Sequence, residues 1–288
     1  MPELPEVETT RLSLLAGVEG KRIEKLELRR GDLRVPFSQH FAKRVAGRRV
    51  EAIRRRAKYL LFDLDSGETI IAHLGMSGSF RLAPAKGYRP RTHDHALFHL
   101  EGGRLLAFHD PRRFGLLLLE KTKDIQSHAL FAHLGPEPLE KAFSPAYLEA
   151  ALGKRKGPIK PTLMDQQLVV GVGNIYASES LFLAGIHPAT PSHHVAGDAK
   201  RLIAAIQKTL RAALKSGGST LRDFSGGDGE AGYFQHHFNT YGRRGQPCVA
   251  CGHAIEEITQ GGRATFFCPH CQKKESRRDE TRGKKTKK

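Results

Sequence analysis

The residues best able to do chemistry stand at the start of the chain, which begins MPELPEVE. If Met1 is removed, Pro2 presents a secondary amine, with the carboxyl groups of Glu3 and Glu6 nearby in sequence. An α-amino group has a pKa of about 7.7–8.0, so part of it is neutral and nucleophilic at cellular pH. Such an amine can attack an electrophilic carbon to form an iminium, and a neighbouring carboxyl can transfer protons.

The same residues also fit a plain helix start. Proline favours the first helical turn, and acidic residues favour the positive end of the helix dipole. We therefore predict a helix from Pro5 to about Ala16, ended at Gly17. The first residues alone leave open whether Pro2 is a nucleophile or only part of this helix start.

The charge of the chain indicates what such an amine could act on. The 288 residues carry a formal net charge of +17, and the pI is about 9.9. The stretch 273–288 holds nine basic and three acidic residues, so most of the positive excess belongs to the rest of the chain. An excess of this size favours a polyanionic partner, most simply nucleic acid.

Length and hydropathy bound the architecture. A chain of 288 residues is long enough for about two domains with a real core. It has no apolar run of about eighteen residues, so we expect no membrane span. Its start lacks a charged region followed by an apolar one, so we expect no secretion signal and a cytoplasmic protein.

All four cysteines fall in one short segment, as Cys248-x2-Cys251 and, sixteen residues later, Cys268-x2-Cys271. Two such pairs can complete a tetrahedral zinc site. Four thiolates leave no open coordination position, so the predicted zinc is structural and not catalytic. Two disulfides are the alternative, but this spacing in a cytosolic chain favours zinc.

Two short apolar runs between the cysteine pairs predict a hairpin. They cover 255–259 and 263–267, and Gln260-Gly261-Gly262 turns between them because glycine adopts positive φ. Arg263 then lies at the tip of a metal-stapled hairpin, a rigid place for a phosphate contact. An arginine at such a tip is often merely solvated, so its position alone assigns it no role.

The rest of the chain divides into a strand-rich part and a helical part. Apolar runs separated by Gly, Pro and Asp turns predict an all-β sandwich or barrel packed with the first helix. The break Gly135-Pro136-Glu137-Pro138 is a candidate hinge, after which helical periodicity begins. The expected strands are 23–28, 50–53, 59–64, 69–74, 96–100, 104–108 and 115–119, and the expected helices are 145–152, 173–183 and 198–214.

Two tight loops present side chains suited to DNA. HLGMSG (73–78) exposes Met76 between glycines, and DPRRFG (110–115) exposes two arginines and Phe114. Apolar side chains on such loops of a basic protein can wedge between base steps and fill the space of an extruded nucleotide. We therefore call 73–78 and 110–115 the first and second wedge loops. Each loop taken alone is explained equally well by a Met or Phe that completes a core.

Two further segments carry weaker signals. A basic cluster, 54–58, leads into an apolar strand and includes Lys58, although charge at a strand edge has the same appearance. The segment VGVGNIY opens a helix with Asn174, a capping-type residue, and helix N-termini bind phosphate readily. A lone Gly-x-Gly is also typical of a close-packed turn.

Taken in order, these motifs resemble the formamidopyrimidine-DNA glycosylase family, bacterial enzymes that remove oxidised purines. The resemblance runs from Met1 to Gln272. Endonuclease VIII shares the architecture, but its start usually reads PEGPE and it lacks the DPRRFG loop, so Leu4 and that loop favour the purine enzyme. The segments that carry the resemblance are PELPEVET, RRAKYLL, HLGMSG, DPRRFG, KPTLMDQ, VVGVGNIYASE, GYF and the four-cysteine ribbon.

The resemblance implies an α+β multidomain fold. Its expected parts are an N-terminal catalytic β-sandwich with flanking helices (1–135), a helix–two-turn–helix DNA-binding domain (136–240), a four-cysteine zinc-ribbon hairpin (241–272) and a basic disordered tail (273–288). The implied cofactor is one structural zinc ion, and the implied partner is double-stranded DNA that contains oxidised purines. We expect a monomer.

The resemblance also implies a bifunctional glycosylase and abasic-site lyase of base excision repair. Pro2 attacks C1′ of the damaged nucleotide, displaces the base and forms a Schiff base with the sugar. Glu3 is the general acid and base at the sugar, and Glu6 helps to hold the reacting groups. Lys58 serves β-elimination, and Arg263 serves δ-elimination.

DNA contacts follow from the same resemblance. Asn174 and Arg263 are expected to clamp the phosphates around the kinked lesion. Met76, Arg112 and Phe114 fill the void left by the flipped base, and Arg112 hydrogen-bonds the orphaned cytosine, which explains a preference for 8-oxoguanine opposite C. Further expected DNA contacts are His93 and Arg155, and expected neighbours of the lesion pocket are Lys160 and the loop Ser225–Tyr233.

Two other functions explain part of the sequence. A non-catalytic reader of damaged DNA needs the wedge loops, Asn174 and the zinc hairpin, but not an amine at Pro2 beside Glu3. A zinc-ribbon RNA-binding protein suits the charge but leaves the N-terminus and the wedge loops unexplained. Borohydride trapping on a duplex with 8-oxoguanine opposite C separates the enzyme from both.

Overall fold

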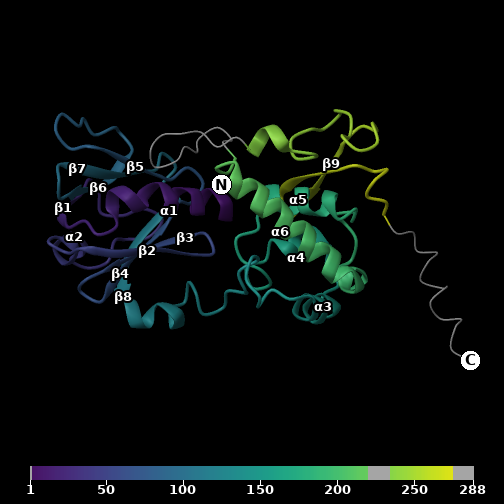
Figure 1. The fold of residues 1–288 in the computed structure, drawn as a ribbon, viewed down its shortest axis with the longest axis horizontal. Coiled ribbons are helices and arrows are strands. Elements are labelled where there is room, and N and C mark those ends of the chain that lie inside the picture. Colours follow the sequence, from purple (N-terminus) through teal and green to yellow (C-terminus); the bar gives the residue numbers. More distant parts are fainter. Residues whose placement is uncertain (1, 220–233, 275–288) are drawn as a thin grey trace, which may run out of the picture. The chain divides into compact units, whose positions relative to one another are not determined.

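The computed structural model describes residues 2–219 and 234–274. The chain packs as two compact units (Figure 1). Unit 1 comprises Met1–Leu134 and Leu210–His237, and unit 2 comprises Gly135–Thr209 and Phe238–Lys288. The first division lies between Leu134 and Gly135, next to the expected hinge Gly135-Pro136-Glu137-Pro138. The expected domain boundaries at 135, 240 and 272 stay predictions.

Unit 1 is built on two four-stranded antiparallel sheets. One has the strand order β1-β6-β7-β5, and the other has the order β2-β3-β4-β8. The predicted β-sandwich is therefore confirmed. The strands are β1 Ile23–Leu28, β2 Val50–Arg56, β3 Tyr59–Leu64, β4 Glu68–His73, β5 Ser79–Pro84, β6 Asp94–Leu100, β7 Arg104–His109 and β8 Leu116–Lys121.

The sequence did not predict β5, and its position explains why. This strand pairs only with β7, so it lies at the edge of its sheet. It turns Phe80 and Leu82 toward the core, but only Phe80 of this strand is fully buried. Two inward residues between Gly78 and Pro84 are too short a pattern to stand out.

The core of unit 1 lies between the two sheets and under helix α1 (Leu4–Val18). Val7, Leu14 and Val18 of α1 are at most 1% exposed and belong to this core. A Cβ at Gly17 would lie 2.1 Å from Leu82 Cδ2, so this glycine lets α1 approach β5 instead of ending the helix. Two short elements complete the unit's N-terminal part, α2 Phe41–Val45 and the 3₁₀ helix η1 Thr122–Ser127.

Unit 2 is mainly helical and ends in a β-hairpin. All three predicted helices form, whereas α4 and the 3₁₀ helices are additions. Helix α6 is the last of the predicted three and runs from unit 2 into unit 1; it buries Leu202, Ile206, Leu210 and Ala213, as its periodicity predicts. The helical elements are α3 Pro145–Gly153, α4 Ile159–Leu163, α5 Asn174–Leu183, η2 Ser192–Asp198, α6 Ala199–Lys215 and η3 Phe234–His237, the last in unit 1.

The C-terminal hairpin forms as the glycine pair predicts. Strands β9 (Glu256–Gln260) and β10 (Arg263–Phe267) pair antiparallel, with Gln260 opposite Arg263. Gly261 and Gly262 have φ of +56° and +72°, the signs that a two-residue type I′ turn requires. Strand β10 packs against α5, which fixes the hairpin within unit 2 (Figure 1).

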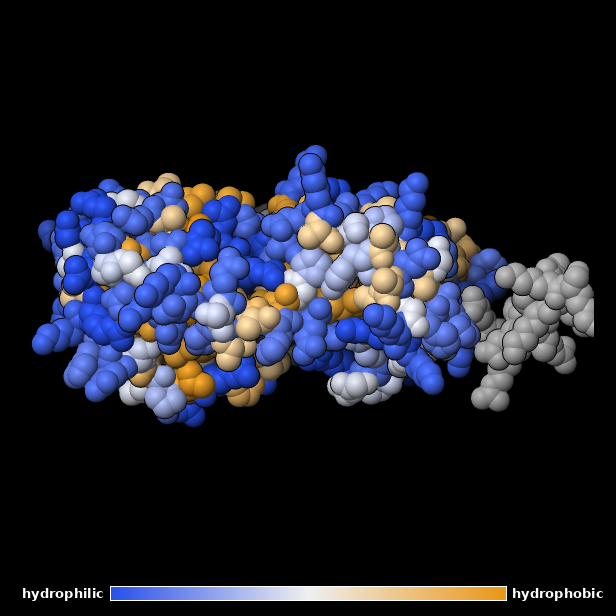
Figure 2. Space-filling view, turned by 90° about the horizontal axis from the view of Figure 1, so that it is seen from below, coloured by the Kyte–Doolittle hydropathy of each residue, from blue (hydrophilic) through white to orange (hydrophobic). Residues whose placement is uncertain are grey.

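Sheets in unit 1 and helices with a hairpin in unit 2 make the predicted α+β class correct. Hydrophilic side chains predominate on the face drawn in Figure 2. Among the described residues, no helix combines the length and apolar character needed to cross a bilayer.

Candidate active site and nucleic-acid interface

The N-terminal candidates lie together where α1 begins. Pro2 is buried, and Glu3 and Glu6 are 3% and 2% exposed. Both carboxyl groups are thus withdrawn from water at the positive end of a helix dipole, where acidic side chains are stabilised. The structure therefore combines the two sequence interpretations, because the helix start holds the candidate chemical groups.

Glu6 binds two segments that are far apart in the sequence. Its Oε2 accepts the Glu3 N–H at 2.9 Å. Its Oε1 accepts the Ser219 N–H at 2.8 Å and the Ser219 hydroxyl at 3.0 Å. Gly218 has a φ of +77°, and a Cβ there would lie 3.1 Å from Glu6 Oε1. Glu6 therefore fixes the backbone directly after Pro2 against the segment that follows α6.

Lys58 lies in the tight turn between β2 and β3 and is 7% exposed. The preceding residue, Ala57, has a φ of +53°, and its carbonyl accepts Arg55 Nη1 at 3.0 Å. Arg55 Nε also donates to Glu8 Oε2 at 3.0 Å. Glu8 belongs to α1, so one arginine ties the Lys58 turn to the helix that carries the N-terminal carboxylates.

This tie is ionic at neutral pH. Burial acts to raise the pKa of Glu8, but hydrogen bonds and charge from Arg11 and Arg55 outweigh it and leave the pKa below its ordinary value. Arg11 in turn donates to the Ile53 carbonyl of β2 at 3.1 Å. Helix α1 is therefore attached to β2 at two points near Lys58.

The two wedge loops of unit 1 touch through their backbones. Gly75 has a φ of +61°, and a Cβ there would lie 2.3 Å from the Phe114 carbonyl carbon. Met76 and Phe114 project from these loops and are 40% and 46% exposed. They do not complete the core, which removes the alternative explanation of both loops.

A buried carboxylate shapes the second loop. Asp110 is fully buried, and it accepts the Ser77 hydroxyl and the Gly115 N–H, each at 2.7 Å. Ser77 Oγ also accepts the Arg112 N–H at 3.2 Å. The Arg112 guanidinium lies 5.0 Å from the centroid of the Phe114 ring, a cation–π distance. Asp110 thus presents Arg112 and Phe114 as one rigid group.

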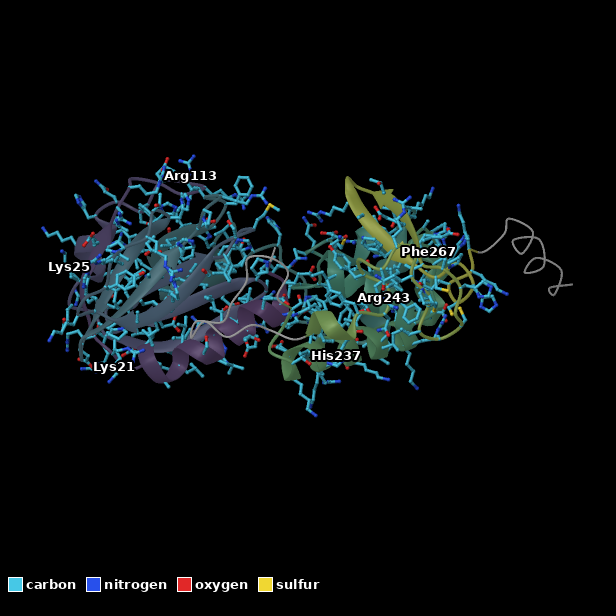
Figure 3. All side chains as sticks on the ribbon, turned by 90° about the horizontal axis from the view of Figure 1, so that it is seen from above. Lys21, Lys25, Arg113, His237, Arg243 and Phe267 are labelled. Atoms are coloured by element: carbon cyan, nitrogen blue, oxygen red, sulfur yellow. The ribbon has the colours of Figure 1, made fainter. Side chains whose placement is uncertain are left out.

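His93 and Arg113 flank these loops. His93 is exposed, and its carbonyl accepts the Asp110 N–H at 2.9 Å. Arg113 has a φ of +57° and lies at the outer edge of unit 1 in Figure 3. Cationic and ring groups therefore lie on the DPRRFG loop and beside its first residue.

In unit 2, Lys160 and Asn174 bind the start of the hairpin strand β10. Lys160 is 1% exposed; its ammonium donates to Asn174 Oδ1, to Thr265 Oγ1 at 2.8 Å and to the Ala264 carbonyl at 3.2 Å. Asn174 Nδ2 donates to the same carbonyl at 3.1 Å. The expected helix cap at Asn174 is wrong, because Gly173 holds the N-cap position and the Asn174 side chain is engaged by the hairpin.

Arg263 starts β10 and is exposed at the hairpin tip. A pocket of about 180 Å³ is lined by Arg263, Gln260 and Gly261 on one side and by residues from Lys160 to Asp165 on the other. Arg155 is paired with Asp165, with Nη1 2.9 Å from Oδ2. The structure therefore brings Lys160, Asn174 and Arg263 together around one hairpin, whereas Arg155 already has a carboxylate partner.

Among the buried carboxylates of the described residues, Asp110 and Glu179 each hold a loop, and the sequence assigned neither of them a role. In the sequence, Asp110 can be recognised only as the first residue of a turn. Glu179 of α5 is 1% exposed and accepts the backbone N–H groups of Asn239, Thr240 and Tyr241 at 2.8–2.9 Å. The sequence signal that could have revealed Glu179 is an acidic residue at the end of a segment of mainly apolar and small residues, VVGVGNIYASE.

The four cysteines are arranged as a zinc site requires. Cys251 and Cys268 Sγ atoms lie 3.4 Å apart, and those of Cys248 and Cys271 lie 3.9 Å apart. A tetrahedral zinc with Zn–S bonds of about 2.3 Å needs sulfurs about 3.8 Å apart, so the set fits one ion. The predicted single structural zinc is confirmed.

Some of the expected features fall outside the described residues. These are Met1, the loop Ser225–Tyr233 that was expected beside the lesion pocket, and most of the basic tail, 275–288.

Comparison with known families places the chain. Residues 1–117 match the formamidopyrimidine-DNA glycosylase N-terminal domain, residues 134–225 match the H2TH domain of the same enzyme, and residues 245–274 match a zinc finger found in FPG and IleRS. The chain belongs to the formamidopyrimidine-DNA glycosylase family. The expected family and enzyme class, a DNA glycosylase with abasic-site lyase activity, are thereby confirmed.

Relatives and solved structures match between 94% and 96% of this chain. The formamidopyrimidine-DNA glycosylase of Azorhizobium caulinodans is 48% identical over 293 residues, which covers 95% of this chain and all of the relative. The MutM (Fpg) protein from Thermus thermophilus is 41% identical with a TM-score of 0.85, over 96% of this chain and all of that one. Lactococcus lactis Fpg in complex with DNA containing an abasic site is 34% identical with a TM-score of 0.87, over 94% of this chain and all of that one.

The hydrogen bonding of the first wedge loop requires His73 to be unprotonated at Nδ1. Its Nδ1 accepts the Gly75 N–H at 3.0 Å, a bond that only the unprotonated nitrogen can accept. Burial first, and then the charges of Lys58 and Arg34, lower the pKa of His73 from 6.5 to about 4.

We predict that stability falls as the pH drops from 6.5 toward about 4. The unfolded chain binds a proton at His73 more readily than the folded chain in this window. This residue should therefore contribute a slope of up to about 1.4 kcal/mol per pH unit. Denaturant unfolding of wild type and His73→Gln at several pH values measures it, with the exposed His133→Gln as control. Equal pH slopes for wild type and His73→Gln would contradict the assignment.

We predict that Gly75→Ala separates the wedge loops. Its Cβ would meet the Phe114 backbone and push the two loops apart. Lesion excision should then fall by about tenfold or more, because Met76 and Phe114 would be misplaced relative to the DNA. Gly102→Ala is the matched control, because Gly102 also has a positive φ, +81°, but open space at its Cβ. Single-turnover excision rates and thermal unfolding of both variants provide the measurement. The idea fails if both variants lose only the same amount of stability and keep the wild-type rate.

Proposed function

We propose that this DNA glycosylase excises oxidised purines, namely 8-oxoguanine opposite C and formamidopyrimidines, and then cuts the strand by β,δ-elimination. The observation that carries the proposal is the buried Pro2–Glu3 start, which Glu6 holds and Arg55 links to the Lys58 turn. A module that only reads DNA has no use for an amine placed in this way.

The solved relatives support a damaged-DNA substrate. Structures of Lactococcus lactis Fpg contain DNA with an abasic site or with Fapy-dG. By inference, the partner of this chain is duplex DNA that carries a comparable lesion. The net charge of +17 supports such a partner, because basic side chains release counterions from the phosphates and supply salt-dependent affinity.

The first chemical step uses the Pro2 nitrogen once Met1 is removed. The nitrogen attacks C1′ of the extruded nucleotide, the N–C1′ bond forms, and the bond from C1′ to the base breaks. The base leaves with a proton, and Glu3 transfers a proton at the sugar as the ring opens to the iminium.

The later steps are eliminations from the iminium. Its positive charge acidifies the proton on C2′, so loss of that proton expels the 3′ phosphate, and a second elimination expels the 5′ phosphate. Lys58 is proposed to donate a proton or bind the adjacent phosphate in the first elimination. The exposed Arg263 is proposed to do likewise in the second.

Unit 1 also offers the groups that replace the extruded base. Extrusion costs a few kcal/mol, least for a damaged or poorly paired base, so damage itself contributes to selection. We propose that Met76 and Phe114 fill the vacated space and that Arg112 donates to the unpaired cytosine. Their exposure and the shared scaffold of Asp110 support this role.

Unit 2 is proposed to hold the phosphates. Asn174 and Arg263 are assigned to the phosphates around the kink, with His93 of unit 1 and Arg155 as further DNA contacts. Lys160 is assigned to the neighbourhood of the lesion, and its bonds to Asn174 and Thr265 support an added role in positioning the hairpin. Arg155 would have to share its guanidinium between Asp165 and DNA.

We further propose that the protein works as a monomer in the cytoplasm. One chain carries the amine, the wedge loops and the hairpin, and four zinc-binding thiolates suit a reducing compartment.

We predict that Pro2→Gly keeps DNA affinity but loses base excision by about 100-fold or more, because glycine supplies a primary amine in a less constrained backbone. Borohydride trapping on a duplex with 8-oxoguanine opposite C measures the covalent adduct, and gel retardation measures affinity. Pro5→Ala is the control, since Pro5 belongs to the same helix start but has no amine to offer. Equal losses of affinity and excision in Pro2→Gly would show that Pro2 is structural.

We predict that zinc removal, or Cys251→Ser, weakens DNA binding by about tenfold or more, because the metal holds the hairpin that carries Arg263. The single-turnover rate at saturating DNA should change less than the dissociation constant. Fluorescence anisotropy with the chelated and zinc-restored protein gives both comparisons. Unchanged affinity in the metal-free protein would defeat the prediction.

A further inference from the structure

Two histidines lie face to face on the outside of the zinc finger. His253 follows Cys251 by two residues, and His270 lies between Cys268 and Cys271. Both side chains are exposed, and their rings are parallel, with centroids 4.3 Å apart and an interplanar angle of 8°. The C-x2-C pairs do not require either histidine, so the four-thiolate zinc leaves them unexplained.

A third metal ligand lies beside this pair. One ring nitrogen from each histidine and the Sγ of Cys251 all lie within 4.8 Å of one another. Zinc bonds of about 2.0–2.1 Å to nitrogen and 2.3 Å to sulfur put the ligand atoms of one ion about 3.3–3.8 Å apart. The two parallel rings must turn out of their stacked planes to aim a nitrogen at one ion, and both side chains are exposed, which gives them room to turn.

The donor set defines the class of metal. Imidazole and thiolate ligands suit borderline divalent ions such as Zn²⁺ and Ni²⁺, whereas Mg²⁺ and Ca²⁺ require oxygen ligands. Cys251 is only half-buried, and its sulfur belongs to both groups: it lies within 4.8 Å of the other three sulfurs of the finger and within 4.8 Å of one ring nitrogen of each histidine. A thiolate has more than one lone pair and can bind two metal ions at once.

We propose that Cys251, His253 and His270 form a second, exchangeable site for a borderline divalent metal, in which the Cys251 thiolate bridges to the structural zinc. Water completes the coordination of the second ion. The structural zinc keeps all four thiolates, so binding at the second site adds an ion and displaces none.

The chain contains a matched pair of histidines for comparison. His193 and His194 are also exposed, and their ring centroids are also 4.3 Å apart, but their planes meet at 68°. Among the residues that the structure describes, no cysteine or carboxylate joins them in a three-ligand group. The two pairs thus share the spacing of their imidazoles, whereas the His193/His194 pair lacks a third ligand among the described residues.

The experiment uses zinc-loaded full-length protein and Ni²⁺. After equilibrium dialysis, elemental analysis gives zinc and nickel per chain, and absorption spectroscopy reports thiolate-to-nickel charge transfer. Wild type and His193→Gln/His194→Gln should each keep one zinc, bind one nickel and show the band. His253→Gln/His270→Gln should keep its zinc but bind nickel about tenfold more weakly or worse, without the band.

Three results would overturn the proposal. Nickel that replaces zinc one for one shows exchange at the four-thiolate site. Nickel bound without the charge-transfer band shows that Cys251 is not a ligand. Equal affinity in wild type and His253→Gln/His270→Gln shows that the histidines are not ligands. Retained zinc in every variant also shows that the finger is folded, so a loss of nickel cannot be due to unfolding.

Discussion

A buried carboxylate must receive hydrogen bonds from the protein. In this protein, buried carboxylates fix the loops of the candidate site and the segment before the zinc finger. Glu6 holds the backbone after Pro2 and the segment at Ser219. Asp110 holds the loop that presents Phe114. Glu179 holds the segment at 239–241 that leads into the zinc finger. Because an unsatisfied buried charge costs several kcal/mol, each of these loops has one strongly preferred shape.

The partners of these carboxylates also preserve the positive surface. In the described part of the chain, Asp110 and Glu179 are bound by backbone N–H groups and by side chains without charge. Their burial therefore consumes no lysine or arginine. Exposed arginines such as Arg112 and Arg263 remain available for a polyanion. Glu8 is the contrasting case, since its two arginine partners join α1 to β2 inside unit 1.

Strong local patterns predicted much of the fold. The glycine pair at Gly261 and the cysteine spacing specify the hairpin and its metal, because turn geometry and metal coordination are local constraints. The period of α6 is visible for the same reason. Strand β5 escaped prediction because its burial depends on a neighbour, β7, that only the folded chain supplies.

The candidate site was only partly visible in the sequence. The motifs supplied Pro2, Glu3 and Lys58, but the sequence could not show that Arg55 and Glu8 join the turn to the helix. Asn174 was assigned a helix cap, yet its amide is held by a strand 90 residues away. Such long-range partners depend on tertiary packing, which no local pattern encodes.

The backbone contact between Gly75 and Phe114 has a mechanical consequence. If Met76 and Phe114 enter a base stack as proposed, they would enter it together, because their loops touch at Gly75 and Phe114. A protein that slides along a duplex would therefore probe each base step with one preformed pair of side chains. It would not have to order two separate loops at each base step. The entropic cost of such ordering would otherwise recur at every step along the DNA.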